Sequence, residues 1–385
     1  MLGERYDEPP SGSSHGSMNN QMLPPDQQEP QLLLEGDEFH VSHDGIARSF
    51  YSLAAGSSSS TGGSPALALE EIYDLQRAKK TFVVRAQEPF DTPISGDDGD
   101  EGSRTVEVLS KQAEGLAPLG RPIASIDIQE IEHGVFDSAG TGSTTWEASI
   151  AMALYFNSHP DQLLGDAVEV GCGIGLGGIL NTVGSSMFER EDSSSEFKSV
   201  TLTDGNPEVL QQCKQNIQSV LSSLPTAMNS FPPIQVSELD WDDFVNPRTD
   251  GTSNHKTYHT VIACDCAYLH TEIEALSRTV KGLLREGVSA KIHVFGPYNR
   301  SALHAVIEYL QEELDLDVCV EWIEMNRYRL KPGSRERKHD LGQSSASIEE
   351  CAYASKSIVK FLHVTACHKT NESHRPNDSL ADIDL

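Results

Sequence analysis

Strand-like and helix-like stretches alternate from Thr144 onward, and this alternation limits the fold more than any other feature of the chain. The stretch TTWEASIAMALYFNSH at Thr144 places apolar side chains three to four residues apart, as one helix face requires. Further helical stretches start at Pro207 and Arg300. Strand-like runs start near Ala167, Ser199, Ile234, Thr260, Lys291, Asp317 and Ser357. Such alternation predicts an α/β fold: a Rossmann-like, seven-stranded, doubly wound sheet with helices on both faces.

The first 120 residues have a different character. They are rich in Pro, Ser, Gln, Asn and acidic residues, and such a composition buries too little apolar surface to offset the entropy of ordering. We therefore expect a largely disordered, low-complexity N-terminal arm with short ordered islands. In one island, apolar residues between Leu67 and Leu75 predict a short amphipathic helix. Strand-like runs over 105–110 and 124–132 lead into a domain expected over 121–370, with a polar tail over 371–385.

Charge and cysteine content exclude several classes of function. The chain has 58 acidic and 29 basic residues, so nucleic acid and membrane surfaces are not expected as partners. No apolar run approaches the roughly 18 residues of a membrane span, and no secretory signal is visible. The seven cysteines include no C-x-x-C pair, which indicates reduced thiols and no metal site. A cytoplasmic protein is expected, with the nucleus as an alternative.

A glycine-rich turn follows the first strand of the predicted domain. Residues 171–178 read G-C-G-I-G-L-G-G, and Gly173, Gly175 and Gly178 satisfy the pattern G-x-G-x-x-G. Glycines let the backbone approach a ligand, and the next helix presents its N-terminus there. The turn predicts a nucleotide-like cofactor. Because dinucleotide enzymes share this pattern, a nicotinamide dehydrogenase remains an alternative, as does a purely structural turn.

Acidic residues stand at the ends of the predicted strands, where ligands bind in doubly wound sheets. Glu169 lies in an otherwise apolar strand, where a carboxylate is costly unless something such as an amine binds it. Asp204 suits a ribose diol, although a helix N-cap is the alternative. The third strand ends in Asp240, which could bind the amine of an adenine, and Trp241, whose indole could lie against the ring. The fourth strand ends at Asp265 and Tyr268.

Four motifs together resemble one family. They are G-S-T-T-W-E at 142–147, V-E-V-G-C-G-I-G-L at 168–176, L-D-W at 239–241 and D-x-x-Y at 265–268. In combination they resemble the seven-β-strand protein lysine methyltransferases of methyltransferase family 16, over about 121–367. T-D-G-N at 203–206 and C-D-C-A-Y-L at 264–269 look most like the calmodulin-lysine methyltransferase branch.

The resemblance implies a class I methyltransferase fold with S-adenosylmethionine as cofactor and no metal. It implies a cofactor site lined by Trp146, Glu169, Gly171, Gly173, Asp204, Trp241 and Cys264, and the same turns add Cys172, Gly175, Asn206 and Asp240. Asp265 and Tyr268 would face the target lysine of a protein substrate. Amide and base N-methyltransferases of similar fold carry two prolines where this chain has Cys266 and Ala267. A small-molecule methyltransferase and a non-catalytic cofactor-binding scaffold stay open, and a monomer is expected.

Overall fold

A computed structural model describes the part of the chain that forms the sheet and its helices. The described residues are 46–53, 67–74, 76–86, 122–131, 140–187, 197–224, 231–245, 256–268, 273–287, 289–330 and 353–369. The strand expected over 105–110 and the tail over 371–385 lie outside them. None of the described helices is long and apolar enough to cross a membrane.

All described strands belong to one mixed sheet with the order β4-β3-β2-β1-β10-β11-β9-β8-β5-β6-β7. The strands of the expected core are β5 (Gly165–Val170), β6 (Phe197–Asp204), β7 (Ile234–Glu238), β8 (Thr260–Cys264), β9 (Lys291–Pro297), β10 (Leu316–Leu330) and β11 (Tyr353–His368). These seven confirm the predicted α/β class. The sheet has eleven strands rather than seven, because β1 to β4 extend it beyond β10.

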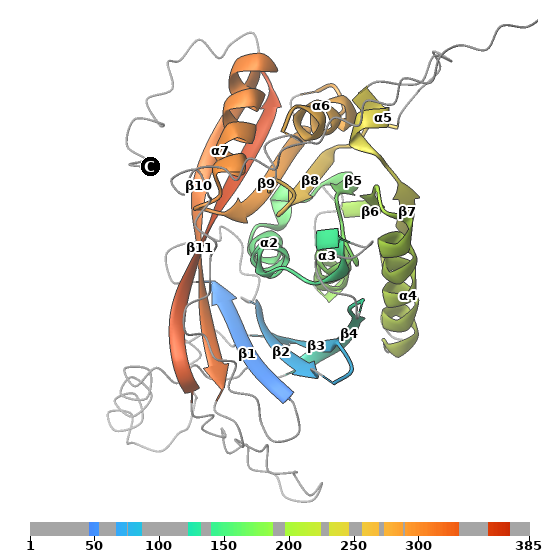
Figure 1. The fold of residues 1–385 in the computed structure, drawn as a ribbon, viewed down its shortest axis with the longest axis vertical. Coiled ribbons are helices and arrows are strands. Elements are labelled where there is room, and N and C mark those ends of the chain that lie inside the picture. The colour runs from blue at the N-terminus through green and yellow to red at the C-terminus, as the bar shows by residue number, and fades with distance from the viewer. Residues whose placement is uncertain are drawn as a thin grey trace, which may run out of the picture. The chain divides into compact units, whose positions relative to one another are not determined.

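Helices cover both faces of the core strands (Figure 1). On one face lie α2 (Glu147–Ser158), α3 (Leu176–Met187) and α4 (Pro207–Ser223), whose apolar residues share one buried cluster. On the other lie α5 (Trp241–Val245), α6 (Ile273–Leu283) and α7 (Ser301–Glu308), packed into a second cluster. Two buried clusters separated by a sheet are the arrangement that the alternating pattern predicted.

The ordered islands of the N-terminal region are strands of this same sheet. They form β1 (Ile46–Leu53), β2 (Leu67–Asp74) and β3 (Lys79–Ala86), and β4 (Pro122–Gln129) follows. The helix predicted between Leu67 and Leu75 is wrong, since β2 pairs antiparallel with β1 and with β3. The strand hydrogen bonds of β2 on both sides outweigh its local preference for a helix. Two ion pairs with β3 add to them, Glu70 with Arg85 and Glu71 with Lys80.

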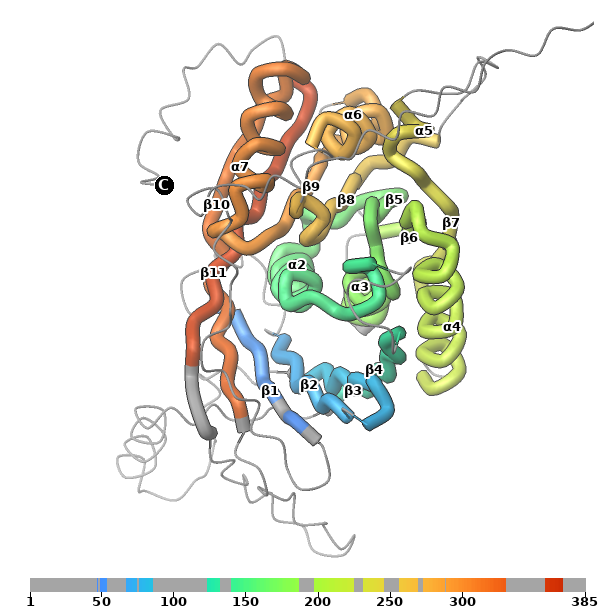
Figure 2. Tube along the Cα trace, in the orientation of Figure 1, coloured from blue at the N-terminus to red at the C-terminus, as the bar shows by residue number. Residues whose placement is uncertain are grey.

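The N-terminal strands also explain why α2 is apolar all round. Ala148 and every residue from 150 to 156 are buried, although a helix covering one face of a sheet needs only one apolar stripe. Strands β1 and β2 contact α2 from the side opposite β8 and β9, and α4 contacts β4. Figures 1 and 2 show α2 and α3 between the two arms of the curved sheet. The helix is enclosed, so its whole circumference is core.

Strand direction places the candidate site. Strands β5 to β9 run parallel to one another, so their carboxyl ends share one edge of the sheet. Strand β5 pairs with β6 on one side and β8 on the other, which makes the strand order reverse there. Ligands of doubly wound sheets bind at such a reversal, outside the carboxyl ends of the strands.

Candidate functional site

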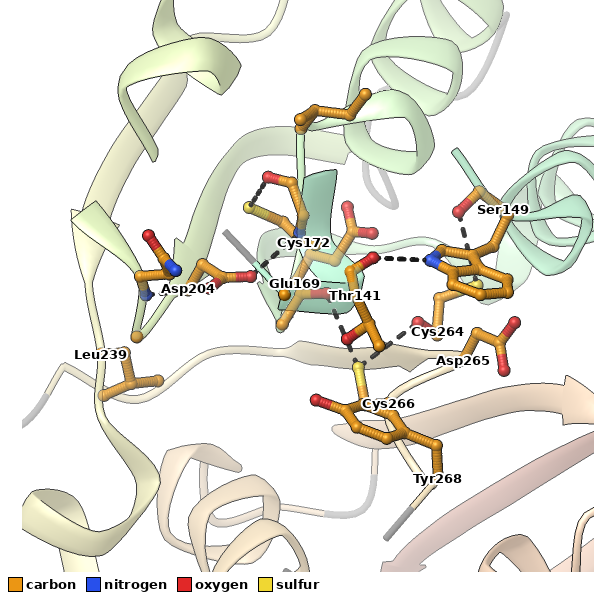
Figure 3. Close-up of a pocket in the computed structure, with 18 of the residues that line it drawn as sticks. Thr141, Ser149, Glu169, Cys172, Asp204, Leu239, Cys264, Asp265, Cys266 and Tyr268 are labelled. Carbon is orange, nitrogen blue, oxygen red and sulfur yellow. Dashed lines mark hydrogen bonds between the residues drawn. The ribbon is translucent and has the colours of Figure 1, made fainter. Parts of the chain in front are cut away.

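A cavity of about 370 Å³ opens at this edge, beyond the ends of β5, β6 and β8 (Figure 3). Three groups of residues form its wall: the glycine-rich turn after β5, the segment that precedes α2, and the turns after β6, β7 and β8. The wall includes Trp146, Glu169, Gly171, Cys172, Gly173, Asp204, Asn206, Asp240, Trp241, Cys264, Asp265 and Tyr268. The structure therefore brings together residues that the sequence analysis took from five separate places.

The first two glycines of the turn are required by their backbone and by their neighbours. Gly171 and Gly173 have φ angles of 67° and 55°, a region that residues with a Cβ rarely adopt. A Cβ on Gly171 would lie 2.7 Å from the Cys266 sulfur. Gly175 does not line the cavity; a Cβ there would lie 2.7 Å from the Cys213 sulfur, so this glycine lets α4 approach the turn.

Glu169 is the buried carboxylate of the site. It is only 2% exposed, and its Oε2 atom has no hydrogen-bond partner. Burial raises the pKa of Glu169 to about 8, although a backbone hydrogen bond from Gly178, in the first turn of α3, acts in the opposite direction. Gly177 and Gly178 make room for this carboxylate, because a Cβ on either would lie within 3.0 Å of its oxygens. An unsatisfied buried acid on a cavity wall fits a cationic ligand.

Asp204 ends β6 and is fixed by backbone donors. Its Oδ2 accepts from the Gly173 amide at 3.1 Å, and its Oδ1 accepts from the Asn206 amide at 3.0 Å. Burial raises the pKa of Asp204, while these amides act in the opposite direction. The helix cap considered as an alternative for Asp204 is provided by Asn206, which accepts from the first amides of α4. Asp204 is therefore held beside the glycine turn.

Two tryptophans belong to the cavity wall. Trp241 is the first residue of α5, not the end of β7 as predicted, because Asp240 accepts from the Asp242 and Asp243 amides and starts the helix there. Its ring is close to the position that a Cβ on Gly171 would take. Trp146 precedes α2, and its indole nitrogen donates to the Thr141 carbonyl at 3.0 Å. Two apolar rings on the wall suit a flat heterocycle.

Asp265 directly follows β8 and has an unusual backbone. Its φ is 53°, a region that costs energy for residues other than glycine and that Asp and Asn tolerate best. Its side chain is 4% exposed, and the Arg300 guanidinium lies 3.1 Å from its Oδ1. Burial raises the pKa of Asp265 to about 6, and Arg300 opposes that shift. A buried carboxylate held in a strained backbone is typical of a functional position.

Tyr268 lies three residues further on and also lines the cavity. Figure 3 shows the Asp265 carboxylate and the Tyr268 hydroxyl pointing to opposite sides, with Cys264 and Cys266 between them. The Cys266 thiol donates to the Val170 carbonyl at 3.0 Å and ties the end of β8 to β5. Cys264, Asp265, Cys266 and Tyr268 all line the cavity, and the Cys266 thiol also holds the two strand ends together.

Arg300 is the residue that sequence reasoning missed. It stands in the turn between β9 and α7, pairs with Asp265, and places its guanidinium 5.8 Å from the centre of the Trp146 ring. The sequence prediction used the residues that follow β6 and β8, which gave Asp204 and Asp265, but it did not use those that follow β9. Applied to that strand as well, the same rule reaches Arg300.

The residues present fit S-adenosylmethionine. Glu169 offers an unsatisfied buried oxygen to a cation, Gly171 and Gly173 allow close approach, and the Asp204 carboxylate can accept from the hydroxyls of a ribose diol. The rings of Trp146 and Trp241 offer apolar surface for the adenine. Among the described residues, no group of three or more potential ligands could hold a metal ion.

Comparison with known proteins agrees with this geometry. Residues 127–311 match the family model for lysine methyltransferase. A calmodulin-lysine N-methyltransferase from Arabidopsis thaliana is 24% identical over 168 residues, which is 43% of this chain and 49% of that protein. The chain thus matches about half the length of this relative.

Two solved structures are similar at a lower level. An O-methyltransferase from Bacillus cereus in complex with SAH has a TM-score of 0.32 at 12% identity, covering 72% of this chain and 94% of that one. A ribosomal protein L11 methylase from Lactobacillus delbrueckii subsp. bulgaricus has a TM-score of 0.32 at 13% identity, covering 59% and 81%. The family match over residues 127–311 confirms the motif resemblance, and it supports S-adenosylmethionine as the cofactor.

Proposed function

We propose that the protein is an S-adenosylmethionine-dependent methyltransferase that methylates the ε-amine of a lysine in a protein substrate. The observation that supports this most is Asp265: a carboxylate that is 4% exposed, lies on the wall of the cofactor cavity and has a cation beside it. Its partner, Arg300, is 29% exposed, so the guanidinium can move into solvent. Asp265 is therefore suited to receive a cationic side chain from outside.

The chemistry requires a residue that stabilises positive charge on nitrogen. Bound S-adenosylmethionine supplies a methyl group on a positively charged sulfur. When the neutral lysine nitrogen bonds to the methyl carbon, the carbon–sulfur bond would break and the neutral thioether would leave. The Asp265 carboxylate would stabilise the positive charge that passes to nitrogen. The Tyr268 ring can hold the cationic product, an interaction of roughly 0.5 to 2 kcal/mol. The rest of the acceleration comes from holding the reacting atoms in line within the cavity.

Methyl transfer from radiolabelled S-adenosylmethionine tests this proposal. The full chain is incubated with calmodulin, the substrate in the name of the Arabidopsis relative, and with a protein extract as a broader source of lysines. We expect label on a protein, and mass spectrometry should place the added methyl groups on lysine. Label found only on small molecules would overturn the protein substrate, and binding of the cofactor without any transfer would favour a non-catalytic scaffold.

Arg300→Leu should move the pH dependence of this transfer. The Arg300 cation opposes the effect of burial on Asp265, whose pKa is about 6, so its removal raises that pKa by about one unit or more. The acid side of the rate profile then shifts to higher pH. Rates over pH 5.5 to 9 measure this, with Arg300→Lys expected to stay near wild type. Arg278→Leu, at an exposed pair on α6, is the control; identical profiles for Arg300→Leu and wild type would refute the coupling.

A further inference from the structure

The segment over 140–147, which contains the motif G-S-T-T-W-E, forms a large part of the cofactor cavity wall. Gly140, Thr141, Gly142, Thr144, Thr145 and Trp146 all line it. The segment is short and loop-like, with one turn of 3₁₀ helix over Gly140–Ser143. Trp146 closes it on itself by donating to the Thr141 carbonyl. What holds this loop against the sheet therefore also sets the shape of the cavity.

Glu130, the residue after β4, holds the loop by a single carboxylate oxygen. Its Oε1 accepts from the Thr144 hydroxyl at 3.0 Å, the Thr145 amide at 2.8 Å and the Thr145 hydroxyl at 2.9 Å. The backbone adds a further link, because the Ile131 amide donates to the Ser143 carbonyl at 3.0 Å. The side chain of Glu130 is only 6% exposed, so these bonds are sheltered from water.

Lys80 of β3 neutralises this carboxylate and contacts the loop itself. Its ammonium lies 3.3 Å from Glu130 Oε1 and 3.1 Å from Glu71 Oε1, and it donates to the Thr145 hydroxyl at 2.6 Å. It also lies 4.9 Å from the centre of the Tyr73 ring. Burial alone would lower the pKa of Lys80, but Glu71 and Glu130 outweigh it and raise the pKa, so the ammonium stays charged. One cation thus balances two buried acids.

Strands β10 and β1 hold the start of α2. Glu147, the first residue of that helix, accepts from Arg327 of β10 at 2.8 Å. The Tyr51 hydroxyl of β1 donates to Glu71 at 2.6 Å and lies 3.5 Å from Glu147. A continuous polar network therefore runs from β1, β2 and β3 to both ends of the sequence T-T-W-E. Lys80, Glu71 and Tyr51 lie outside the segment that matches the family model.

We propose that Lys80 and Glu130 are positioning residues for cofactor binding, and that strands β1 to β3 serve as the rigid support of the Gly140–Trp146 wall. The network touches the loop at its polar atoms and leaves Trp146 to face the cavity. Without Lys80, two buried carboxylates stand close together with no cation between them, and the Thr145 hydroxyl loses a donor. The loop then loses its fixed position. Because the cofactor must order the loop when it binds, its affinity falls. This inference rests on the proposed cofactor-dependent function.

Titration calorimetry of S-adenosylmethionine into the full chain tests the inference. We expect Lys80→Met to weaken binding about tenfold and to raise the KM for S-adenosylmethionine with little change in kcat, while Lys80→Arg restores most of the affinity. Lys79→Met is the matched control: the neighbouring lysine on β3 pairs with Asp127 at the surface, away from the loop, and should bind like wild type. A merely structural role would not produce the split between KM and kcat.

A folded Lys80→Met variant that binds within twofold of wild type would overturn the inference, and thermal unfolding establishes that it is folded. If Lys80→Met does not fold, the same titration of Glu130→Gln tests the inference instead. It is isosteric, leaves Lys80 paired with Glu71, removes the Lys80–Glu130 ion pair and weakens the hold on Thr144 and Thr145. We expect severalfold weaker binding, and unchanged binding would overturn the inference. If wild type itself binds no S-adenosylmethionine, the proposed function fails first, and the wild-type titration separates the two results.

Discussion

Asp265→Asn will slow methyl transfer at least about 100-fold, while the affinity for S-adenosylmethionine stays within about threefold of wild type. The substitution removes the charge that stabilises the developing ammonium, keeps the size of the side chain and also ends the ion pair with Arg300. Asn is the best replacement because it tolerates the left-handed backbone at φ 53°, whereas Ala would add strain at this position. Steady-state rates with a labelled methyl donor measure the loss, and calorimetry measures the affinity.

The matched control for this prediction is Asp243→Asn on α5. That residue is an exposed aspartate near the same edge of the sheet and does not line the cavity. We expect its rate to remain near wild type. An Asp265→Asn variant that retains more than about a tenth of the wild-type rate would show that the carboxylate has no major part in the reaction.

Glu169→Gln will make the folded protein more stable at pH 8.5 and will weaken S-adenosylmethionine binding by roughly tenfold or more. The pKa of Glu169 is about 8 in the folded protein, against an ordinary value near 4.5. Between these values the folded state keeps its proton and the unfolded state loses it, so stability falls as pH rises, by up to about 1.4 kcal/mol per pH unit. Gln has no proton to lose, so the variant avoids this loss of stability. Its free energy of unfolding should exceed that of wild type by about a few kcal/mol at pH 8.5, and the difference should shrink toward pH 5.

The loss of binding has a separate cause. A charge-assisted hydrogen bond to a cationic ligand contributes about 1.5 to 3 kcal/mol, which Gln cannot replace. Denaturant unfolding at pH 5, 7 and 8.5 measures the first effect, and calorimetry measures the second. Glu238→Gln, at the exposed end of β7, is the control and should change neither. If Glu169→Gln were no more stable than wild type at any pH, the carboxylate would not be costly in the folded protein.

The core of the fold and most of the cavity wall follow from local sequence patterns. Strands β5 to β9 are short, and each is followed by a helix, whereas β10 and β11 are long and pair antiparallel with each other. Parallel pairing brings the carboxyl ends of the strands to one edge of the sheet. For this reason the sequence alone could group Glu169, near the end of β5, with Asp204 and Asp265. This grouping needs only the order of the elements.

The N-terminal strands could not be predicted in the same way. Strand β2 carries two adjacent acids, Glu70 and Glu71, that look solvent-exposed in sequence but are buried because Arg85 and Lys80 lie across on β3. Ion pairs between neighbouring strands leave no periodic signal within either strand, and the surrounding low-complexity composition points toward disorder. Arg300 lies just after β9, so its place at this edge follows from the order of the elements, whereas its pairing with Asp265 depends on the fold.

The most direct test of the central claim, that the edge of β5, β6 and β8 binds S-adenosylmethionine, is calorimetric titration of the full chain with this cofactor and, separately, with NAD. Asp204→Ala removes the acid at the end of β6, and Asp166→Ala removes one from the opposite end of β5 as the control. We predict micromolar binding of S-adenosylmethionine alone, weakened at least about tenfold by Asp204→Ala and unchanged by Asp166→Ala. Binding of NAD instead, or of neither ligand, would contradict the account.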